Sequence, residues 1–169
     1  VAVLQQAGPA YIRLGKKGEP TVHSGPPALE IGRGLVVRDG KNLCILGVGT
    51  MLAVAAQAAD ILAAGGVGAR LVSLHTVKPL DDSLLEDCFR RFPLVAVVEE
   101  HSRLGGAGSA VAEWLAARPE LPGKLLSLGT GDCFTSESGG QKYLRERFGL
   151  TGPAIARQVL ELYERLGQC

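Results

Sequence analysis

Short apolar runs alternate along this chain with longer segments whose apolar residues recur at helical spacing. Runs typical of strands buried on both faces of a sheet lie at residues 43–48, 69–74, 94–98 and 124–128. Helical spacing predicts helices over residues 51–64, 82–92, 109–117, 138–148 and 154–166. Because strands that alternate with helices form parallel sheets covered on both faces, we predict a three-layer α/β/α fold with a mainly parallel sheet.

Several residues indicate where these elements begin and end. Thr50 is a candidate N-cap for the helix that follows it, and Gly65-Gly66 is expected to end that helix. The acidic pair Asp81-Asp82 suits the first turn of the next helix. Upstream, we predict an irregular strand within residues 29–37, a further strand at residues 11–14, and an extended proline-containing linker over residues 21–28.

Composition argues against several classes of function. The 169 residues carry a formal net charge of +1 and only 5% aromatic residues, so we expect no binding to nucleic acid. The four cysteines are far apart and form no C-x-x-C pair, which argues against a zinc site and a disulfide framework and fits a reducing cytoplasm. No apolar run reaches the roughly 20 residues of a membrane span, so we predict a cytoplasmic domain with no membrane partner.

Most of the unusual chemistry follows the predicted strands. Because the carboxyl ends of parallel strands share one edge, where ligands commonly bind, we expect these residues to lie together on one rim of the sheet. We use the word rim for this set, predicted either to bind an anion or to face another domain: Lys78, Glu99, Glu100, His101, Ser102, Gly105, Gly106, Gly108 and Ser109.

The residues alone leave both uses of the rim open. Glu99, Glu100 and His101 could act as general acids or bases, but neighbouring strand residues point to opposite faces and cannot all converge on one substrate. Gly105, Gly106 and Gly108 either leave backbone N–H groups available to bind an anion or allow the backbone to turn sharply. Gly47-Val48-Gly49 lacks the third glycine of a dinucleotide fingerprint. We predict no catalytic, cofactor-binding or metal-binding residue in this chain.

From Gly32 onward the sequence resembles the C-terminal domain of transketolase-type thiamine diphosphate enzymes. The segments that carry the resemblance, in order, are 38–41 (RDGK), 46–50 (LGVGT), 77–81 (VKPLD), 99–109 (EEHSRLGGAGS), 134–139 (FTSESG) and 148–151 (FGLT). Residues 8–15 (GPAYIRLG) resemble the last strand of the pyrimidine-binding domain that precedes it in such enzymes. The resemblance therefore implies that the chain has two parts. Residues 1–28 would be the last strand of the pyrimidine-binding domain and a linker, and residues 29–169 would be the C-terminal domain.

The resemblance implies a domain without catalytic duty that serves dimer and domain assembly. The parent would transfer a two-carbon ketol unit between sugar phosphates, using thiamine diphosphate and magnesium held by its pyrimidine- and pyrophosphate-binding domains or subunit. That parent is expected to be a homodimer and could be a split transketolase. Alternative parents are deoxyxylulose-phosphate synthase and the β subunit of 2-oxoacid dehydrogenases. Two rivals stay open: a regulatory small-molecule or anion module at Gly105–Ser109, and an independent enzyme that uses His101.

Overall fold

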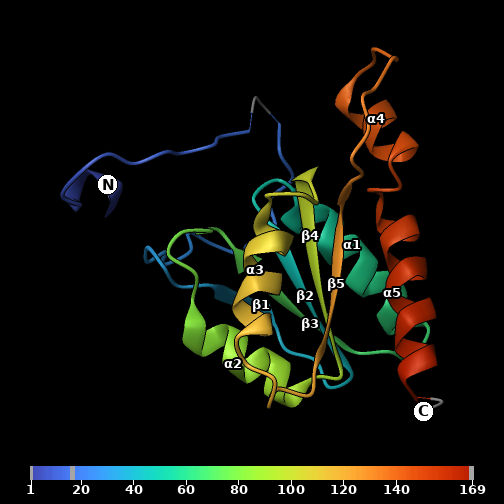
Figure 1. Cartoon of the computed structure of the whole chain (residues 1–169). Coiled ribbons are helices and arrows are strands. Elements are labelled where there is room, and N and C mark those ends of the chain that lie inside the picture. Colours follow the sequence, from blue (N-terminus) through green and yellow to red (C-terminus); the bar gives the residue numbers. More distant parts are fainter. Residues whose placement is uncertain (1, 16–17, 168–169) are drawn as a thin grey trace.

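A mainly parallel sheet with helices on both faces forms the centre of the molecule, as seen in a computed structural model that describes residues 2–15 and 18–167 (Figure 1). The elements, in chain order, are η1 (Ala2–Gln5), β1 (Leu35–Arg38), β2 (Leu43–Val48), α1 (Met51–Ala64), β3 (Ala69–Leu74), α2 (Asp82–Arg91), β4 (Leu94–Ser102), α3 (Ala107–Ala116), β5 (Lys124–Thr130), α4 (Gln141–Arg147) and α5 (Gly152–Gly167).

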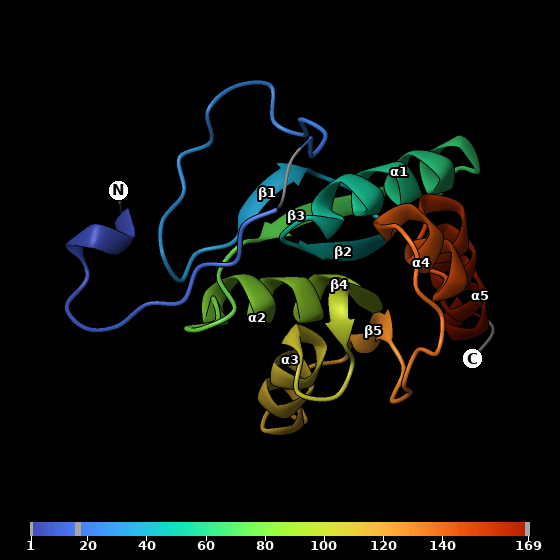
Figure 2. The ribbon, with the colours of Figure 1, turned by 90° about the horizontal axis from the view of Figure 1, so that it is seen from above.

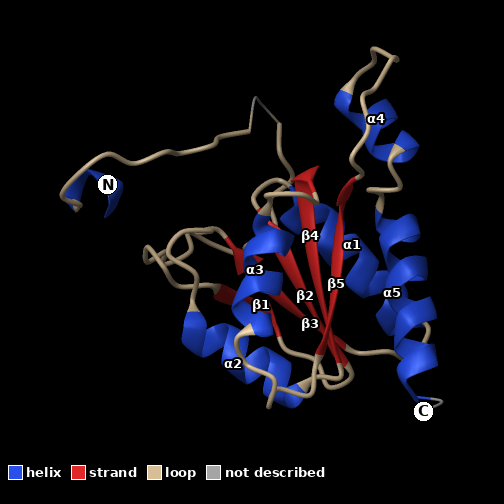
Figure 3. Ribbon diagram, viewed as in Figure 1, coloured by secondary structure: helices blue, strands red, loops and turns tan. Residues whose placement is uncertain are grey.

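The sheet confirms the predicted topology. Its strand order is β1-β3-β2-β4-β5, and only β1 runs antiparallel to its neighbour (Figure 3). The central strands β2 and β3 are buried along almost their whole length, as their aliphatic runs indicate. All carboxyl ends of the parallel strands lie at the upper edge in Figure 1, which is therefore the rim predicted from the sequence.

Two helical layers cover the sheet and give it two separate cores. Helices α1 and α5 lie on one face, and α2 and α3 lie on the other (Figure 2). The first core joins α1, α5 and side chains such as Ile45 and Ala96. The second joins α2, α3 and side chains such as Leu46 and Val97. Alternate residues of β2 and β4 thus face opposite layers, which is the three-layer arrangement expected from the sequence.

The predicted helix ends are partly right. Asp81 caps α2, since its carboxylate accepts a hydrogen bond from the Leu84 N–H at 3.1 Å. Gly66, just after α1, has a positive φ of 86°, as expected of a glycine that ends a helix. Thr50, however, makes no side-chain cap for α1. Its hydroxyl instead donates to the Glu100 carboxylate at 3.1 Å, so Thr50 occupies the predicted N-cap position without forming the side-chain hydrogen bond of a cap.

Several boundaries also differ from prediction. Strand β4 continues to Ser102 instead of ending at residue 98, because its polar end still pairs with β5. The ladder is irregular between Val98 and Ser102, where β4 bulges against β5. The irregular strand predicted within residues 29–37 is reduced to β1, and the helix predicted over 138–148 begins only at Gln141.

The described part of the N-terminal segment packs little on the domain. Residues 11–14, predicted as a strand, form no strand in this structure, and Tyr11, Ile12 and Leu14 are exposed. The segment runs away from the sheet beyond the rim (Figures 1 and 2). Further on, Val22 of the linker packs against the first core. The boundary predicted after residue 28 stays a prediction.

None of the helices in the described ranges is long and apolar enough to cross a lipid bilayer.

Candidate functional site

The rim is built around two consecutive glutamates at the end of β4 whose side chains go to opposite layers. Glu99 is only 2% exposed and reaches the start of α3. Glu100 reaches the start of α1 and the helix α4. The expectation that these neighbouring strand residues point to opposite faces is therefore confirmed.

The Glu99 carboxylate occupies the N-terminus of α3. One oxygen accepts the Ala107 N–H at 2.7 Å and the other accepts the Gly108 N–H at 2.8 Å. A helix N-terminus stabilises a negative charge, because its first N–H groups have no partner within the helix. This chain therefore supplies its own anion at the place where the sequence suggested binding of an external one.

The rim glycines allow this close approach. A Cβ at Gly106 would lie 2.3 Å from a Glu99 carboxylate oxygen, and a Cβ at Gly108 would lie 2.0 Å from the Ser127 hydroxyl. Gly105 has a positive φ of 73°, which the turn itself requires. The glycines thus serve both a sharp turn and the seating of an internal carboxylate.

The Ser109 hydroxyl also bonds within the turn. It donates to the Arg103 carbonyl at 2.6 Å and accepts the Gly105 N–H at 3.0 Å. Since Glu99 accepts the N–H groups of Ala107 and Gly108, three backbone donors of the predicted anion site are engaged by side chains of this chain. The geometry therefore favours a structural turn over an anion-binding turn.

Glu100 joins three elements that are far apart in the sequence. Arg145 of α4 approaches both of its carboxylate oxygens, with Nε at 2.9 Å and Nη2 at 3.1 Å. The Thr50 hydroxyl and the Gln141 amide donate to one of those oxygens at 3.1 and 3.0 Å. The Glu100 backbone carbonyl accepts a hydrogen bond from Arg13 of the N-terminal segment at 3.2 Å. We call Glu100, Arg145, Thr50 and Gln141 the Glu100 cluster.

The Glu100 cluster keeps its carboxylate ionised. Burial acts to raise the pKa of Glu100, but the hydrogen bond and charge of Arg145, with the Thr50 and Gln141 hydrogen bonds, hold that pKa below its ordinary value of 4.5. No local pattern in the sequence predicted this cluster, because Arg145 lies 45 positions from Glu100.

Replacing Arg145 with methionine is expected to lower the free energy of unfolding at pH 7 by about 1–2 kcal/mol, because the partly exposed Glu100 loses its bidentate partner. A folded-state pKa below the unfolded value gives stability that is present above pH 4.5 and lost as pH falls through the folded pKa. The difference between wild type and variant should therefore shrink below pH 4.5, as urea unfolding at several pH values would show.

The matched control for this prediction is Arg147→Met on the same helix. Arg147 is largely exposed and lies 3.5 Å from the Glu137 carboxylate, so its loss should change stability by less than about 0.5 kcal/mol. Equal and pH-independent losses in the two variants would contradict the role given to the Glu100 cluster.

The other rim residues do not join these glutamates in a catalytic arrangement. His101 is exposed, and its Nδ1 lies 2.9 Å from the Ser102 carbonyl oxygen. Lys78 is exposed in the loop after β3. Nearby, burial and the charge of His23 lower the pKa of His75, whose Nδ1 lies 3.1 Å from the Thr76 hydroxyl. Glu99 and Glu100 accept hydrogen bonds from other groups, so neither of these two carboxylates is paired with His101 as the hypothesis of a His101 enzyme would need.

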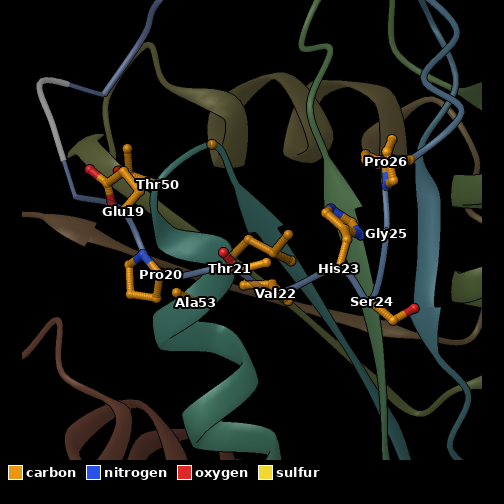
Figure 4. Close-up of a pocket in the computed structure, with 13 residues that line it drawn as sticks. Glu19, Pro20, Thr21, Val22, His23, Ser24, Gly25, Pro26, Thr50 and Ala53 are labelled. Atoms are coloured by element: carbon orange, nitrogen blue, oxygen red, sulfur yellow. The ribbon is translucent and has the colours of Figure 1, made fainter.

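Two open cavities lie along this edge of the domain. The larger, of about 470 Å³, lies between the linker residues 19–27 and the start of α1, with Val22 and His23 along one wall (Figure 4). Sequence reasoning missed it, because a linker gives no sign of the surface on which it folds back. The smaller, of about 360 Å³, is lined by α3, β5 and Arg103, and includes the rim residues Gly108 and Ser109. Among the described residues, no three His, Cys, Asp or Glu side chains gather in a group that could hold a metal ion.

A family model for the C-terminal domain of transketolase matches residues 32–155 of this chain. The 6-deoxy-6-sulfo-D-fructose transketolase subunit SqwH of Clostridium sp. (strain MSTE9) is 37% identical over 163 residues, which cover 96% of this chain and 50% of that protein. The 1-deoxy-D-xylulose-5-phosphate synthase of Synechococcus sp. (strain WH7803) is 36% identical, and the match covers 98% of this chain and 26% of the synthase.

A solved structure agrees with these sequence matches. The structure titled "Split gene transketolase, inactive beta4 tetramer" aligns with a TM-score of 0.83 at 40% identity, covering 91% of this chain and 50% of that one. The chain spans half of the length of the sulfofructose transketolase subunit and about a quarter of the synthase. The fold, the family model and these relatives agree: this chain belongs to the transketolase C-terminal domain family.

Proposed function

We propose that this chain is the non-catalytic C-terminal part of a transketolase-like enzyme and serves the assembly of its domains and of its dimer. The parent reaction is the transfer of a two-carbon ketol unit between sugar phosphates. The family match and the transketolase subunits among its relatives support this proposal. Deoxyxylulose-phosphate synthase is the first alternative parent, since such a synthase is also similar over nearly the whole chain. The β subunit of 2-oxoacid dehydrogenases is the second.

The observation that carries the proposal is the unpaired N-terminal segment. Tyr11, Ile12 and Leu14 are 90%, 57% and 83% exposed, although such residues are usually buried in strands. We infer that residues 8–15 complete a sheet in the preceding pyrimidine-binding domain. The hydrogen bond from Arg13 to the Glu100 carbonyl would then link that domain to the rim of this one.

The proposal assigns thiamine diphosphate and magnesium to the pyrimidine- and pyrophosphate-binding parts of the parent. The two rim carboxylates of this chain support that assignment, because Glu99 and Glu100 already accept hydrogen bonds from other groups of the same chain. A magnesium site needs several oxygen ligands that are free to coordinate. We further expect the parent to work in the cytoplasm, given the free thiols of Cys44, Cys88 and Cys133.

A ketol-transfer assay with thiamine diphosphate and magnesium tests the proposal. The purified chain alone should show no turnover, and the parent with its cofactor-binding parts present should be active. The double variant Ile12→Asp/Leu14→Asp should weaken the binding of this chain to the cofactor-binding parts of the parent by at least about tenfold, as measured by analytical ultracentrifugation. The reason is that two charges would enter the apolar contact proposed for the N-terminal segment. Turnover by the isolated chain would overturn the proposal.

The control for this experiment places a charge on an exposed apolar residue elsewhere. Ile61 of α1 is 44% exposed and lies on a helix that the proposal leaves outside the contact. Ile61→Asp should leave association unchanged. Equal association of wild type and the Ile12/Leu14 double variant would remove the role given to the N-terminal segment.

A further inference from the structure

Two cysteines that are far apart in the sequence touch inside the second core. Cys44 lies on β2 and Cys88 on α2, and their Sγ atoms are 3.6 Å apart. Both residues are fully buried, next to Leu46 and Phe89 of the same cluster. The proposed role in assembly does not involve this cysteine pair, so a function of the pair would be independent of that role.

A buried arginine lies beside the two thiols. Arg70 of β3 pairs through Nη1 with the Asp87 carboxylate, but its Nε is buried and has no hydrogen-bond partner. The Asp39 carboxylate lies 3.7 Å from Nε, beyond hydrogen-bonding distance. An unsatisfied guanidinium N–H in a core is unusual, and the positive charge of Arg70 favours a thiolate at either cysteine.

The surroundings make the two sulfurs unequal. The hydrogen bond from Cys44 lowers the pKa of Cys88 against the effect of burial, and the charge of Arg70 adds to this lowering. The same hydrogen bond and burial raise the pKa of Cys44. We therefore take Cys88 as the attacking thiol, which must lose its proton to act as a nucleophile.

We propose that Cys44 and Cys88 form an oxidisable dithiol, which hydrogen peroxide converts into a disulfide that joins β2 to α2. The Cys88 thiolate attacks one peroxide oxygen and becomes a sulfenic acid, and the O–O bond breaks to release hydroxide. Cys44 then attacks the Cys88 sulfur and displaces a second hydroxide. The two thiol protons and the two hydroxides leave as two water molecules.

The two sulfurs are already in van der Waals contact before this step. The sulfurs must approach from 3.6 Å to the roughly 2.05 Å of a disulfide. Because both thiols are buried, reaction requires a brief local opening that admits a small oxidant such as peroxide. Once formed, the bond would close a loop between positions 44 residues apart and hold α2 against the sheet, which stabilises the folded state.

The test treats the full chain with a few equivalents of hydrogen peroxide, then unfolds it, alkylates the free thiols and maps the peptides by mass spectrometry. We expect a cross-linked peptide pair that contains Cys44 and Cys88, and only two of the four cysteines alkylated. Dithiothreitol should restore the other two thiols. The oxidised protein should unfold at a higher urea concentration, with an unchanged circular dichroism spectrum before unfolding.

Two variants separate this pair from the exposed thiol of Cys133. Cys133→Ala should give the same cross-link, and Cys88→Ala should leave Cys44 as a free thiol after the same treatment. Oxidation confined to Cys133 or Cys169, with Cys44 and Cys88 both alkylated, would overturn the proposal. If Cys88→Ala does not fold, the peptide map of the wild-type protein decides the matter alone.

Discussion

Replacing Glu99 with alanine is expected to lower the free energy of unfolding by about 2–6 kcal/mol. The change removes the acceptor of the Ala107 and Gly108 N–H groups, which are buried at the start of α3. Each buried donor left without a partner costs about 1–3 kcal/mol. Urea unfolding followed by circular dichroism at pH 7 would measure the loss.

Two further variants sharpen this prediction. Glu99→Gln keeps the shape and one acceptor oxygen but turns an NH2 group toward the second N–H, so it should lose about half as much stability as Glu99→Ala. His101→Ala removes an exposed side chain two residues along the same strand and should change stability by less than about 0.5 kcal/mol. A loss below about 1 kcal/mol for Glu99→Ala would show that water can replace this carboxylate.

Replacing Gly106 with alanine is expected to destabilise the domain by about 2–4 kcal/mol. The new Cβ would lie 2.3 Å from a Glu99 oxygen and 2.5 Å from the Ser102 carbonyl oxygen, so the carboxylate must move away from the helix start. Overpacking of this kind and the weakened hydrogen bonds both contribute to the loss. The same unfolding measurement applies.

Gly140 provides a closely matched control. Both glycines occupy the N-cap position of a helix with extended backbone angles, Gly106 before α3 and Gly140 before α4. A Cβ at Gly140 would meet nothing within 4 Å. Gly140→Ala should therefore lose only the modest preference of an N-cap for glycine over alanine, less than about 1 kcal/mol. Equal losses in the two variants would mean that cap preference, and not crowding, explains the glycine at position 106.

The sequence predicted the parts of this fold that local patterns determine. Strands β2 and β3 and helix α1 were predicted with the bounds that the structure has, because continuous aliphatic runs and glycine stops act over a few residues. The opposite orientations of Glu99 and Glu100 followed from strand geometry alone. The mainly parallel order of the sheet followed from the alternation of strands with helices.

The parts that depend on tertiary contacts could not be predicted in this way. The polar end of β4 does not resemble a strand, and it continues as one because β5 pairs with it. Thr50 satisfied the pattern of a helix cap, yet Glu100 competes successfully for its hydroxyl. The partner of Glu100 itself, Arg145, belongs to a helix with no buried residue, whose pattern gave no reason to connect it with β4.

The two adjacent glutamates also help to fix the register of β4 in the sheet. A slip of β4 by one residue that brings Glu100 to the helix start at Ala107 would place His101 opposite Arg145, with every aliphatic neighbour moved to the wrong layer. Arg145 would then face an imidazole in place of the carboxylate with which it pairs here. A single-residue deletion within Leu94–Val98 would consequently weaken the attachment of α4 to β4, although that helix would not itself have been altered.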